Sequence, residues 1–328
     1  MNAWRHYAIV LLFLCACAAL AARVVFLGVS ERQFLQEQGD ARSVRSEVIP
    51  SYRGVVYDRL GEPLAVSTPV VAVWTDPSTV TLSSTDVARL APLLDTAPAS
   101  LARLLADNAD KSFVYLKRRI SWSAAERIRG SEIEGLYYHG EYRRYYPAAE
   151  TTAHLVGVTD VDDVGLEGIE LAFDHLLKGE HGRKIVLKDR LGNTIQDLHY
   201  VRAPRIGEDL NLSVDLRLQY FAHRELKAAV EHHDAASGSL VMLDVGTGEI
   251  LALANAPSYN PNEPLERSYA GMRNRSVTDT YEPGSTVKPF TVLAALESGK
   301  YQADTLIDTA PGYFRVGNKL IEDPVNLG

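Results

Sequence analysis

The sequence predicts an α+β protein with one transmembrane helix at its N-terminus, and three observations support this fold class. Residues 8–22 form an apolar run that resumes at residues 24–29, so the segment, counted through Arg23, is long enough to span a bilayer. The middle of the chain alternates short strand-like and helix-like segments, with glycine and proline between them. Towards the C-terminal end, a strand–loop–strand pattern precedes a helix, which indicates an antiparallel sheet flanked by helices.

The N-terminal apolar segment is predicted to be an uncleaved signal anchor. Residues 7–29 would cross the inner (cytoplasmic) membrane once, with the Arg23 side chain extending to the interface. Arg5 and the amino terminus favour a cytoplasmic N-terminus, which would leave the bulk of the chain in the periplasm. Two cleavage alternatives stay open: residues 19–21 (Ala-Leu-Ala) resemble a signal-peptidase site, and residues 14–17 (Leu-Cys-Ala-Cys) loosely resemble a lipoprotein box.

Composition narrows the classes of function. The net charge is −8, and no basic patch with interleaved aromatic residues occurs, so no nucleic-acid partner is expected. Both cysteines, Cys15 and Cys17, lie in the apolar segment, which excludes disulfides and cysteine-based zinc sites from the rest of the chain. The nine histidines form no metal-binding motif. We therefore expect neither a metal nor another cofactor.

Hydrophobic patterning and turn residues predict the elements between the anchor and the C-terminal helix. A capping box is expected from Ser123 to Glu126. The glycines of residues 165–170 are interpreted as structural turns, because the G-x-x-x-x-G-K sequence of a phosphate loop is missing there. The expected elements are a helix at 30–46, a strand–turn–strand at 49–65, helices at 83–107 and 123–129, a strand at 209–215, an amphipathic helix at 216–232 and a hairpin of strands 239–243 and 250–254.

Ser285 and Lys288 are the candidate catalytic residues. Pro283 and Gly284 form a turn before the serine, and an apolar helical pattern continues until Gly299. Residues three apart are neighbours on a helix, so the Lys288 amine can come within hydrogen-bond reach of the Ser285 hydroxyl. A buried lysine with a lowered pKa can accept the proton of a serine nucleophile. The bare S-x-x-K pattern is also compatible with an ordinary helix that has a serine near its start.

The order and spacing of several short motifs resemble the class B penicillin-binding proteins of the cell-division type, the FtsI-like peptidoglycan D,D-transpeptidases. The resemblance covers essentially the whole chain. The residues that carry it, besides the anchor, are 53–54, 58–59, 144–147, 168–170, 215–219, 246–252, 260–262, 273–274 and 282–289.

This resemblance implies a domain organisation. Residues 1–29 would be the cytoplasmic tail and transmembrane anchor, and residues 30–208 an elongated mixed α/β pedestal of the dimerisation type. Residues 209–328 would be the N-terminal part of a penicillin-binding transpeptidase domain, which is serine β-lactamase-like in fold. The matches at 215–219 and 282–290 favour a role in septal cell-wall synthesis over elongation.

The resemblance also implies a mechanism and partners. Ser285 would attack a D-Ala-D-Ala peptidoglycan stem peptide and Lys288 would accept its proton, while β-lactams would acylate the same serine. A polytopic glycosyltransferase and other division proteins would be partners, with Arg23 either contacting one of them or only extending to the interface. No cofactor is implied.

The chain departs from the family after the nucleophile. Neither an S-x-N nor a K-[ST]-G motif follows Lys288, and Ser258-Tyr259-Asn260, which matches S-x-N literally, precedes Ser285 and is assigned to the following loop. We therefore expect a truncated transpeptidase that is inactive as this chain. The alternatives are a non-catalytic, membrane-anchored scaffold of the division machinery and, less well supported, a β-lactam sensor or β-lactamase.

Overall fold

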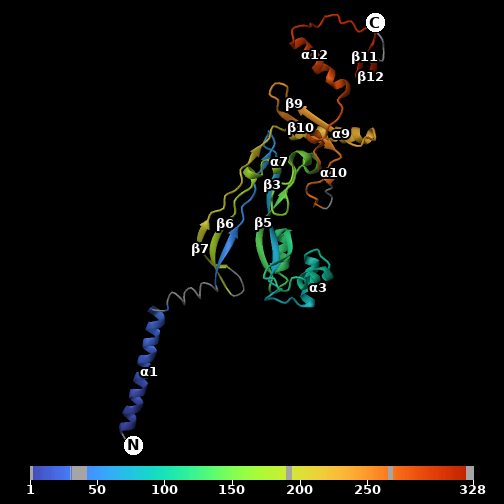
Figure 1. Cartoon of the computed structure of the whole chain (residues 1–328). Coiled ribbons are helices and arrows are strands. Elements are labelled where there is room, and N and C mark those ends of the chain that lie inside the picture. The colour runs from blue at the N-terminus through green and yellow to red at the C-terminus, as the bar shows by residue number, and fades with distance from the viewer. Residues whose placement is uncertain (1–2, 30, 32–42, 190–193, 265–268, 323–328) are drawn as a thin grey trace. The chain divides into compact units, whose positions relative to one another are not determined.

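The computed structural model describes residues 3–29, 31, 43–189, 194–264 and 269–322, and it confirms the α+β class (Figure 1). The chain divides into two compact units, Met1–Thr278 and Asp279–Gly328. The first contains the N-terminal helix, two sheets of three and five strands, and a hairpin. The described part of the second contains a 3₁₀ turn, an α-helix and a short hairpin.

Helix α1 (Ala3–Val29) corresponds to the predicted anchor. Its segment Tyr7–Leu27 has a mean hydropathy of 2.6, and among the described residues it is the one helix long and apolar enough to cross a membrane. The Arg23 guanidinium lies over the Phe26 ring, 5.4 Å from its centroid. Cys15 and Cys17 are free thiols on this helix.

The five-stranded sheet is built around the long strand β3 (Pro63–Thr75). Strand β5 (Tyr137–Tyr145) pairs antiparallel with it from Val66–Tyr145 to Trp74–Tyr137, and β4 (Val114–Ile120) pairs along its other edge. The sheet is completed by β2 (Val56–Tyr57) and β8 (Leu210–Asn211), which pair in parallel. The predicted strand–turn–strand is confirmed as β2 and β3, although the first strand is shorter than expected.

A second sheet has the order β1–β6–β7, from β1 (Val44–Ile49), β6 (Gly182–Lys188) and β7 (Thr194–Arg202). Both pairings are antiparallel. The helix expected at 30–46 is therefore wrong over residues 44–46, which are strand, because pairing with β6 outweighs their weak local helical preference. Residue 30 and residues 32–42 lie outside the described residues.

The main apolar core forms where helices cover one face of the five-stranded sheet built around β3. Val73 and Leu116 of the sheet pack against Leu90, Leu101 and Ile128. The helix expected at 83–107 is wrong as a single helix: it is two, α3 (Ser84–Leu93) and α4 (Pro98–Ala106), separated by Asp95 at φ 50°.

Helix α5 (Trp122–Arg129) confirms the helix predicted at 123–129. The capping box predicted from Ser123 to Glu126 is wrong. Ser121 is the N-cap, and its side chain accepts a hydrogen bond from the Ala124 amide at 3.2 Å. The reciprocal box occurs on α3 instead, between Ser83 and Asp86.

Tight turns join the sheets to the rest of the first unit. Gly54 has no room for a side chain, since a Cβ there would lie 1.9 Å from the carbonyl oxygen of Glu208.

The short helical segments between β5 and β6 are η1 (Ala149–Thr151), α6 (Ala153–Val156), α7 (Gly168–Ala172) and α8 (Asp174–Leu177).

Asp58, which is 1% exposed, connects the β2–β3 turn to the helix that follows β8. One carboxylate oxygen accepts hydrogen bonds from the Leu60 and Glu62 amides at 2.8 Å, and the other accepts from the Leu216 amide at 3.0 Å. Beside it, the Arg59 amide donates to the Val214 carbonyl at 3.0 Å.

Helix α9 (Leu216–His232) has the predicted bounds, and Asp215 caps it by accepting bonds from the Arg217 and Leu218 amides. It packs on the predicted hairpin, β9 (Gly238–Leu243) and β10 (Ile250–Ala256), through Ala222, Ala252 and Ala254. The Gln219 amide joins the two elements, since its nitrogen donates to the Leu253 carbonyl and its oxygen accepts from the Leu253 amide, both at 2.8 Å. Helices α10 (Tyr269–Met272) and α11 (Arg275–Thr278) end the unit.

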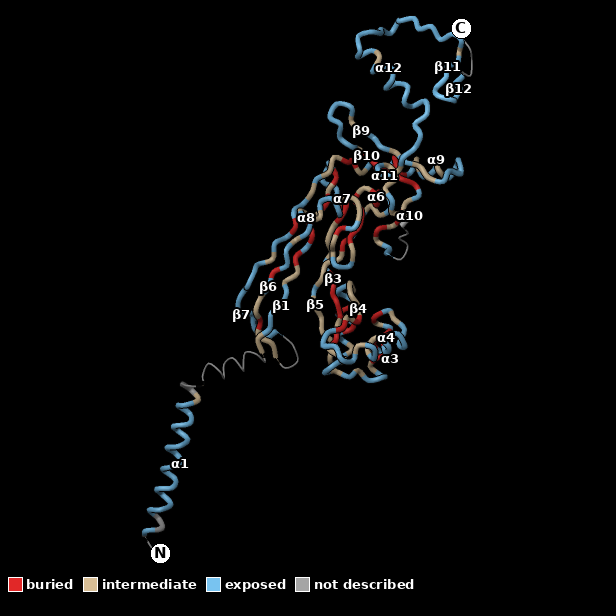
Figure 2. The backbone as a smooth tube through the Cα atoms, in the orientation of Figure 1, coloured by how far each residue is buried: buried red, intermediate tan, exposed pale blue. Residues whose placement is uncertain are grey.

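The second unit consists of η3 (Gly284–Val287), α12 (Lys288–Glu297) and the antiparallel pair β11 (Tyr313–Val316) and β12 (Lys319–Glu322). The predicted helix and its glycine end are confirmed, with Gly299 at φ 68°. Among its described residues none is buried, whereas buried residues cluster in the first unit around β3 and α3 (Figure 2).

Candidate active site

Ser285 lies in a tight turn that leads directly into helix α12. Gly284 adopts a left-handed φ of 57°, and residues Gly284–Val287 form a 3₁₀ turn. Lys288 is the first residue of α12, and Pro289 occupies the first turn of the helix, where a missing N–H costs little. The predicted three-residue spacing therefore falls on consecutive helical turns, although the serine is in a 3₁₀ segment and not in the α-helix itself.

The surroundings of this pair are open. Ser285 and Lys288 are both exposed, and within the described residues no hydrogen bond joins their side chains. On α12, Phe290, Val292 and Leu293 are 69%, 57% and 54% exposed. Lys288 therefore lacks the burial that would lower the pKa of a catalytic lysine, because the described residues supply no walls at this turn.

The literal S-x-N sequence at residues 258–260 has a structural role. Tyr259 is 6% exposed, packs on Ala153 and donates to the Ala153 carbonyl at 3.2 Å. Ser258 donates to the Glu150 carbonyl at 2.8 Å, and the Asn260 side chain accepts from the Asn262 amide at 3.0 Å. All three side chains therefore serve the local fold, in agreement with their assignment to the loop.

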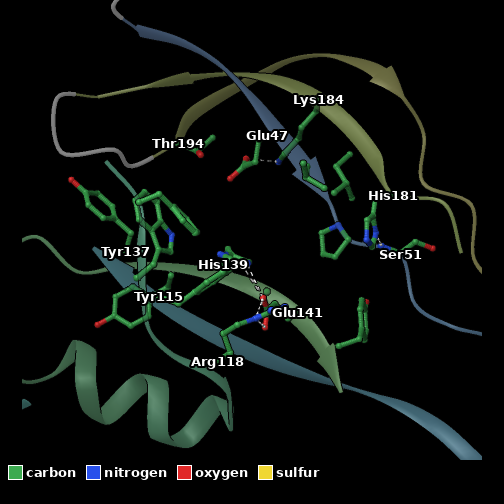
Figure 3. A pocket seen from close by; sticks show the side chains of 18 of the residues that line it. Glu47, Ser51, Tyr115, Arg118, Tyr137, His139, Glu141, His181, Lys184 and Thr194 are labelled. Atoms are coloured by element: carbon green, nitrogen blue, oxygen red, sulfur yellow. Dashed lines mark hydrogen bonds and ion pairs between the residues drawn. The ribbon is translucent and has the colours of Figure 1, made fainter. Parts of the chain in front are cut away.

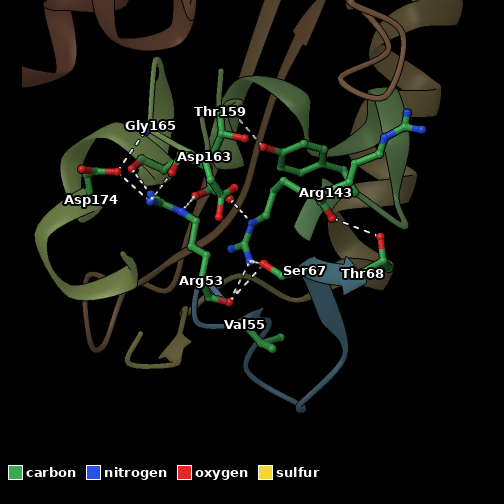
Figure 4. Close-up of polar contacts among 12 residues, drawn as sticks. Arg53, Val55, Ser67, Thr68, Arg143, Thr159, Asp163, Gly165 and Asp174 are labelled. Atoms are coloured by element: carbon green, nitrogen blue, oxygen red, sulfur yellow. Dashed lines mark hydrogen bonds and ion pairs between the residues drawn. The ribbon is translucent and has the colours of Figure 1, made fainter. Parts of the chain in front are cut away.

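A buried ion network lies in the first unit, where residues that carried the family resemblance meet (Figure 4). Glu170 accepts from the Arg53 Nε at 2.5 Å and from the Arg144 Nε at 2.6 Å, and Arg53 Nη1 also donates to Asp174 at 2.6 Å. The Arg53, Arg144 and Glu170 side chains are at most 1% exposed. The sequence indicated these residues as motifs but gave no sign that they are partners.

Electrostatics explain how this network holds its charges. Burial alone lowers the pKa of Arg53, but the Glu170 and Asp174 carboxylates outweigh it and raise that pKa above its usual value. Burial opposes ionisation of Asp174 as well, yet bonds from the Gly165 amide and Arg53 lower its pKa. Asp163 lies nearby, and burial raises its pKa despite the adjacent arginines. The charged forms of Arg53 and Asp174 are thus favoured, and Arg53 and Arg144 share the carboxylate of Glu170 as a buried structural network.

A cleft of about 1180 Å³ opens between the two sheets of the first unit. Figure 3 shows Glu47, Lys184 and Thr194 on one wall and Tyr115, Tyr137, His139 and Glu141 on the other. None of these residues was predicted as a site residue. The aromatic residues among them could have been indicated by the sequence, because segments 113–115 and 137–139 are both rich in aromatic side chains.

Two family profiles match the chain. The penicillin-binding protein dimerisation domain matches residues 48–212, and the penicillin-binding protein transpeptidase domain matches residues 238–324. The first covers the five-stranded sheet, β6, β7 and the end of β1, and the second includes the β9–β10 hairpin and the turn that carries Ser285 and Lys288.

Curated relatives agree with these profiles. The chain is 41% identical over 320 residues to the probable peptidoglycan D,D-transpeptidase PbpC of Pseudomonas aeruginosa, covering 98% of this chain and 57% of that protein. It is 41% identical over 325 residues to the peptidoglycan D,D-transpeptidase FtsI of Escherichia coli K12, covering 98% of this chain and 55% of that protein. The chain therefore spans little more than half the length of these relatives.

A solved structure shows the same fold. A penicillin-binding protein from Helicobacter pylori, solved in complex with MreC, superposes with a TM-score of 0.64 over 86% of this chain and 57% of that one, at 23% identity. At that identity the likeness concerns the fold alone. Together with the profiles and relatives, it establishes that the chain belongs to the class B penicillin-binding proteins.

Proposed function

We propose that the chain is part of a membrane-anchored peptidoglycan D,D-transpeptidase of the division type, with Ser285 as its nucleophile and Lys288 as its base. The observation that carries this proposal is the placement of the two residues, three apart across a 3₁₀ turn that runs into α12. This turn falls inside the segment matched by the transpeptidase profile, and relatives at 41% identity are named D,D-transpeptidases.

The chemistry is acyl transfer through the Ser285 hydroxyl. Lys288 takes the hydroxyl proton while Ser285 Oγ bonds to the carbonyl carbon of the penultimate D-Ala in a stem peptide. The peptide C–N bond then breaks, and the terminal D-Ala leaves with that proton on its amine. An amine of a neighbouring stem attacks the ester, the C–O bond breaks, and Ser285 regains a proton. The Ser285 amide would be one donor to the oxyanion.

We place this activity at the outer face of the cytoplasmic membrane, during septal wall synthesis. The apolar segment Tyr7–Leu27 supports the anchor, and the motif matches at 215–219 and 282–290 support the division type. Stem peptides and β-lactams would bind at Ser285. A polytopic glycosyltransferase and other division proteins would be partners of the anchor and the pedestal, with Arg23 as one candidate contact. The domain limits 29/30 and 208/209 stay predictions.

We also propose that residues 1–328 alone do not catalyse the reaction. Ser285 and Lys288 are both exposed, and no wall of described residues excludes water from them. The apolar side chains of α12 and of the β9–β10 hairpin are exposed as well, among them Phe290 and Leu243 at 69% and 54%. Such faces need a covering surface before a water-excluding site can form.

The test is fluorescent-penicillin labelling of native membranes. We expect one band that Ser285→Ala abolishes and that Lys288→Ala weakens by several orders of magnitude, since the base and nucleophile act as a unit. Ser298→Ala, which removes an exposed serine at the far end of the same helix, should label normally. The band should run well above 36.1 kDa. A labelled product at 36.1 kDa would overturn the proposed inactivity.

The open nucleophile turn also favours a second candidate, a non-catalytic scaffold that uses the anchor and the pedestal. Complementation of a depletion strain separates the two. A scaffold carrying Ser285→Ala would restore division, whereas the enzyme carrying the same change would not.

A further inference from the structure

The cleft between the two sheets presents the uncovered face of the five-stranded sheet. Neighbouring residues on a strand point to opposite faces, so that β3 sends Val73 into the core beneath α3–α5 and Trp74 into the cleft. On β4, Leu116 and Tyr115 divide in the same way. The helices therefore stabilise one face, and the other face contributes side chains that the apolar core does not use.

Those side chains form a continuous aromatic row. The Trp74 ring lies 4.6 Å from Phe113 and 4.5 Å from Tyr137, the latter nearly parallel at 26°. Phe113 continues to Tyr115 at 4.8 Å, and Tyr115 to His139 at 5.6 Å. Phe113 remains 44% exposed. The negative face of an aromatic ring attracts polarised C–H groups, which the flat sides of pyranose rings present.

The lysine and arginine side chains that line the described part of the cleft are already paired with carboxylates. Of the Lys and Arg residues that line its described part, Arg118 pairs with Glu141 at 3.0 Å and Arg129 with Glu126 at 2.8 Å. Lys184 and Lys188 pair with Glu47 at 3.7 and 3.6 Å. Little charge is left over to attract an anionic or cationic polymer, but the paired groups keep free donor and acceptor positions for hydroxyl and amide groups.

The size of the cleft also fits an oligomer. Its volume of about 1180 Å³ exceeds the roughly 300–1,000 Å³ of sites that hold one drug-sized molecule. Across from the aromatic row, Glu47, Lys184 and Thr194 provide a polar wall (Figure 3). A ligand in this cleft would therefore stack on one side and form hydrogen bonds on the other.

We infer that this cleft binds a glycan strand, an uncharged chain of N-acetylated pyranose rings, by stacking on the Phe113–Trp74–Tyr137 row. The inference rests on the proposed function in one respect. A peptidoglycan transpeptidase works beside peptidoglycan, and the glycan strands of peptidoglycan are chains of N-acetylated pyranose rings. It requires nothing of Ser285. A bound strand would hold the wall polymer against the first unit independently of the acyl-transfer step.

The test measures binding of N-acetylglucosamine oligosaccharides, which are uncharged, to the detergent-solubilised chain by calorimetry. Phe113→Leu keeps apolar bulk but removes the ring, and we expect about tenfold weaker binding. Tyr220→Leu, which removes an aromatic residue that is 52% exposed on α9, is the matched control and should bind as the unaltered chain does. Equal unfolding midpoints would show that both variants are folded.

The outcomes separate this inference from the proposed function. Oligosaccharide binding that is weakened by Phe113→Leu and unchanged by Ser285→Ala supports the glycan cleft, even if penicillin labelling fails. No binding, or equal binding by Phe113→Leu and Tyr220→Leu, overturns it and leaves acyl transfer untouched. A photo-crosslinker at position 113 that captures a protein segment in cells, and no glycan, would also overturn it.

Discussion

The buried ion network around Glu170 and the turn that carries Ser285 differ in how far the protein encloses their charged and reactive groups. Arg53 and Glu170 have fully buried side chains, each with a partner, in a region whose strands and helices are in place around them. Ser285 and Lys288 are exposed, on a helix whose apolar residues face solvent. The difference shows that a motif acquires its chemistry from the surface that encloses it, and that only the first of these two motifs is enclosed.

Removing Glu170 should have the largest effect. Glu170→Gln leaves the buried Arg53 and Arg144 without their shared carboxylate, which should cost about 3–5 kcal/mol of unfolding free energy. Glu249→Gln breaks the exposed pair with Arg59, whose side chains are 44% and 37% exposed, and should cost about 1 kcal/mol or less. Urea unfolding of both variants measures the difference. Equal losses would show that the network contributes no more than a surface pair.

A matched pair of leucines tests whether the two units differ in packing. Leu90→Ala empties a fully buried position on α3 and should cost about 2–5 kcal/mol. Leu293→Ala, at a position on α12 that is 54% exposed, should change stability by about 0.5 kcal/mol or less. Thermal unfolding followed by circular dichroism distinguishes them. A large loss from Leu293→Ala would mean that α12 is covered in solution.

The smallest effect concerns two buried histidines. Burial lowers the pKa of His154 and of His223 below the usual value near 6.5. The unfolded chain then binds more protons than the folded one below about pH 6.5, so stability should fall as the pH drops from there towards the folded pKa values. Each pKa unit of difference contributes about 1.4 kcal/mol.

Substitutions can verify the origin of that pH dependence. His154→Gln and His223→Gln should each flatten the decline in the urea midpoint between about pH 6.5 and about pH 5. The exposed His232→Gln should leave it unchanged. If the decline persists in both buried variants, other groups cause it.

Local patterns predicted the elements whose signals lie within one segment. Helix α9 was predicted with its observed bounds, because Asp215 precedes a regular amphipathic pattern. The hairpin and the glycine end of α12 were predicted for similar reasons. The division of residues 83–107 into two helices was missed, since a left-handed Asp95 leaves little trace in hydrophobic periodicity.

Long-range relations were beyond the reach of the sequence. Arg53 and Glu170 are 117 positions apart, and no periodicity joins them before the sheets and α7 bring them together. The aromatic cleft was missed because its rings come from three strands. The S-x-x-K spacing alone does not indicate whether Lys288 is buried, because burial depends on the surfaces that surround the helix.

Asp58 gives the first unit a mechanical property. Its two carboxylate oxygens tie the β2–β3 turn to the start of α9, 158 positions further along the chain, and the Arg59 amide adds a bond to the Val214 carbonyl beside them. A pulling force applied between β2 and α9 is therefore shared by several short bonds that must break together. A displacement of the β2–β3 turn should therefore be passed directly to the first residues of α9.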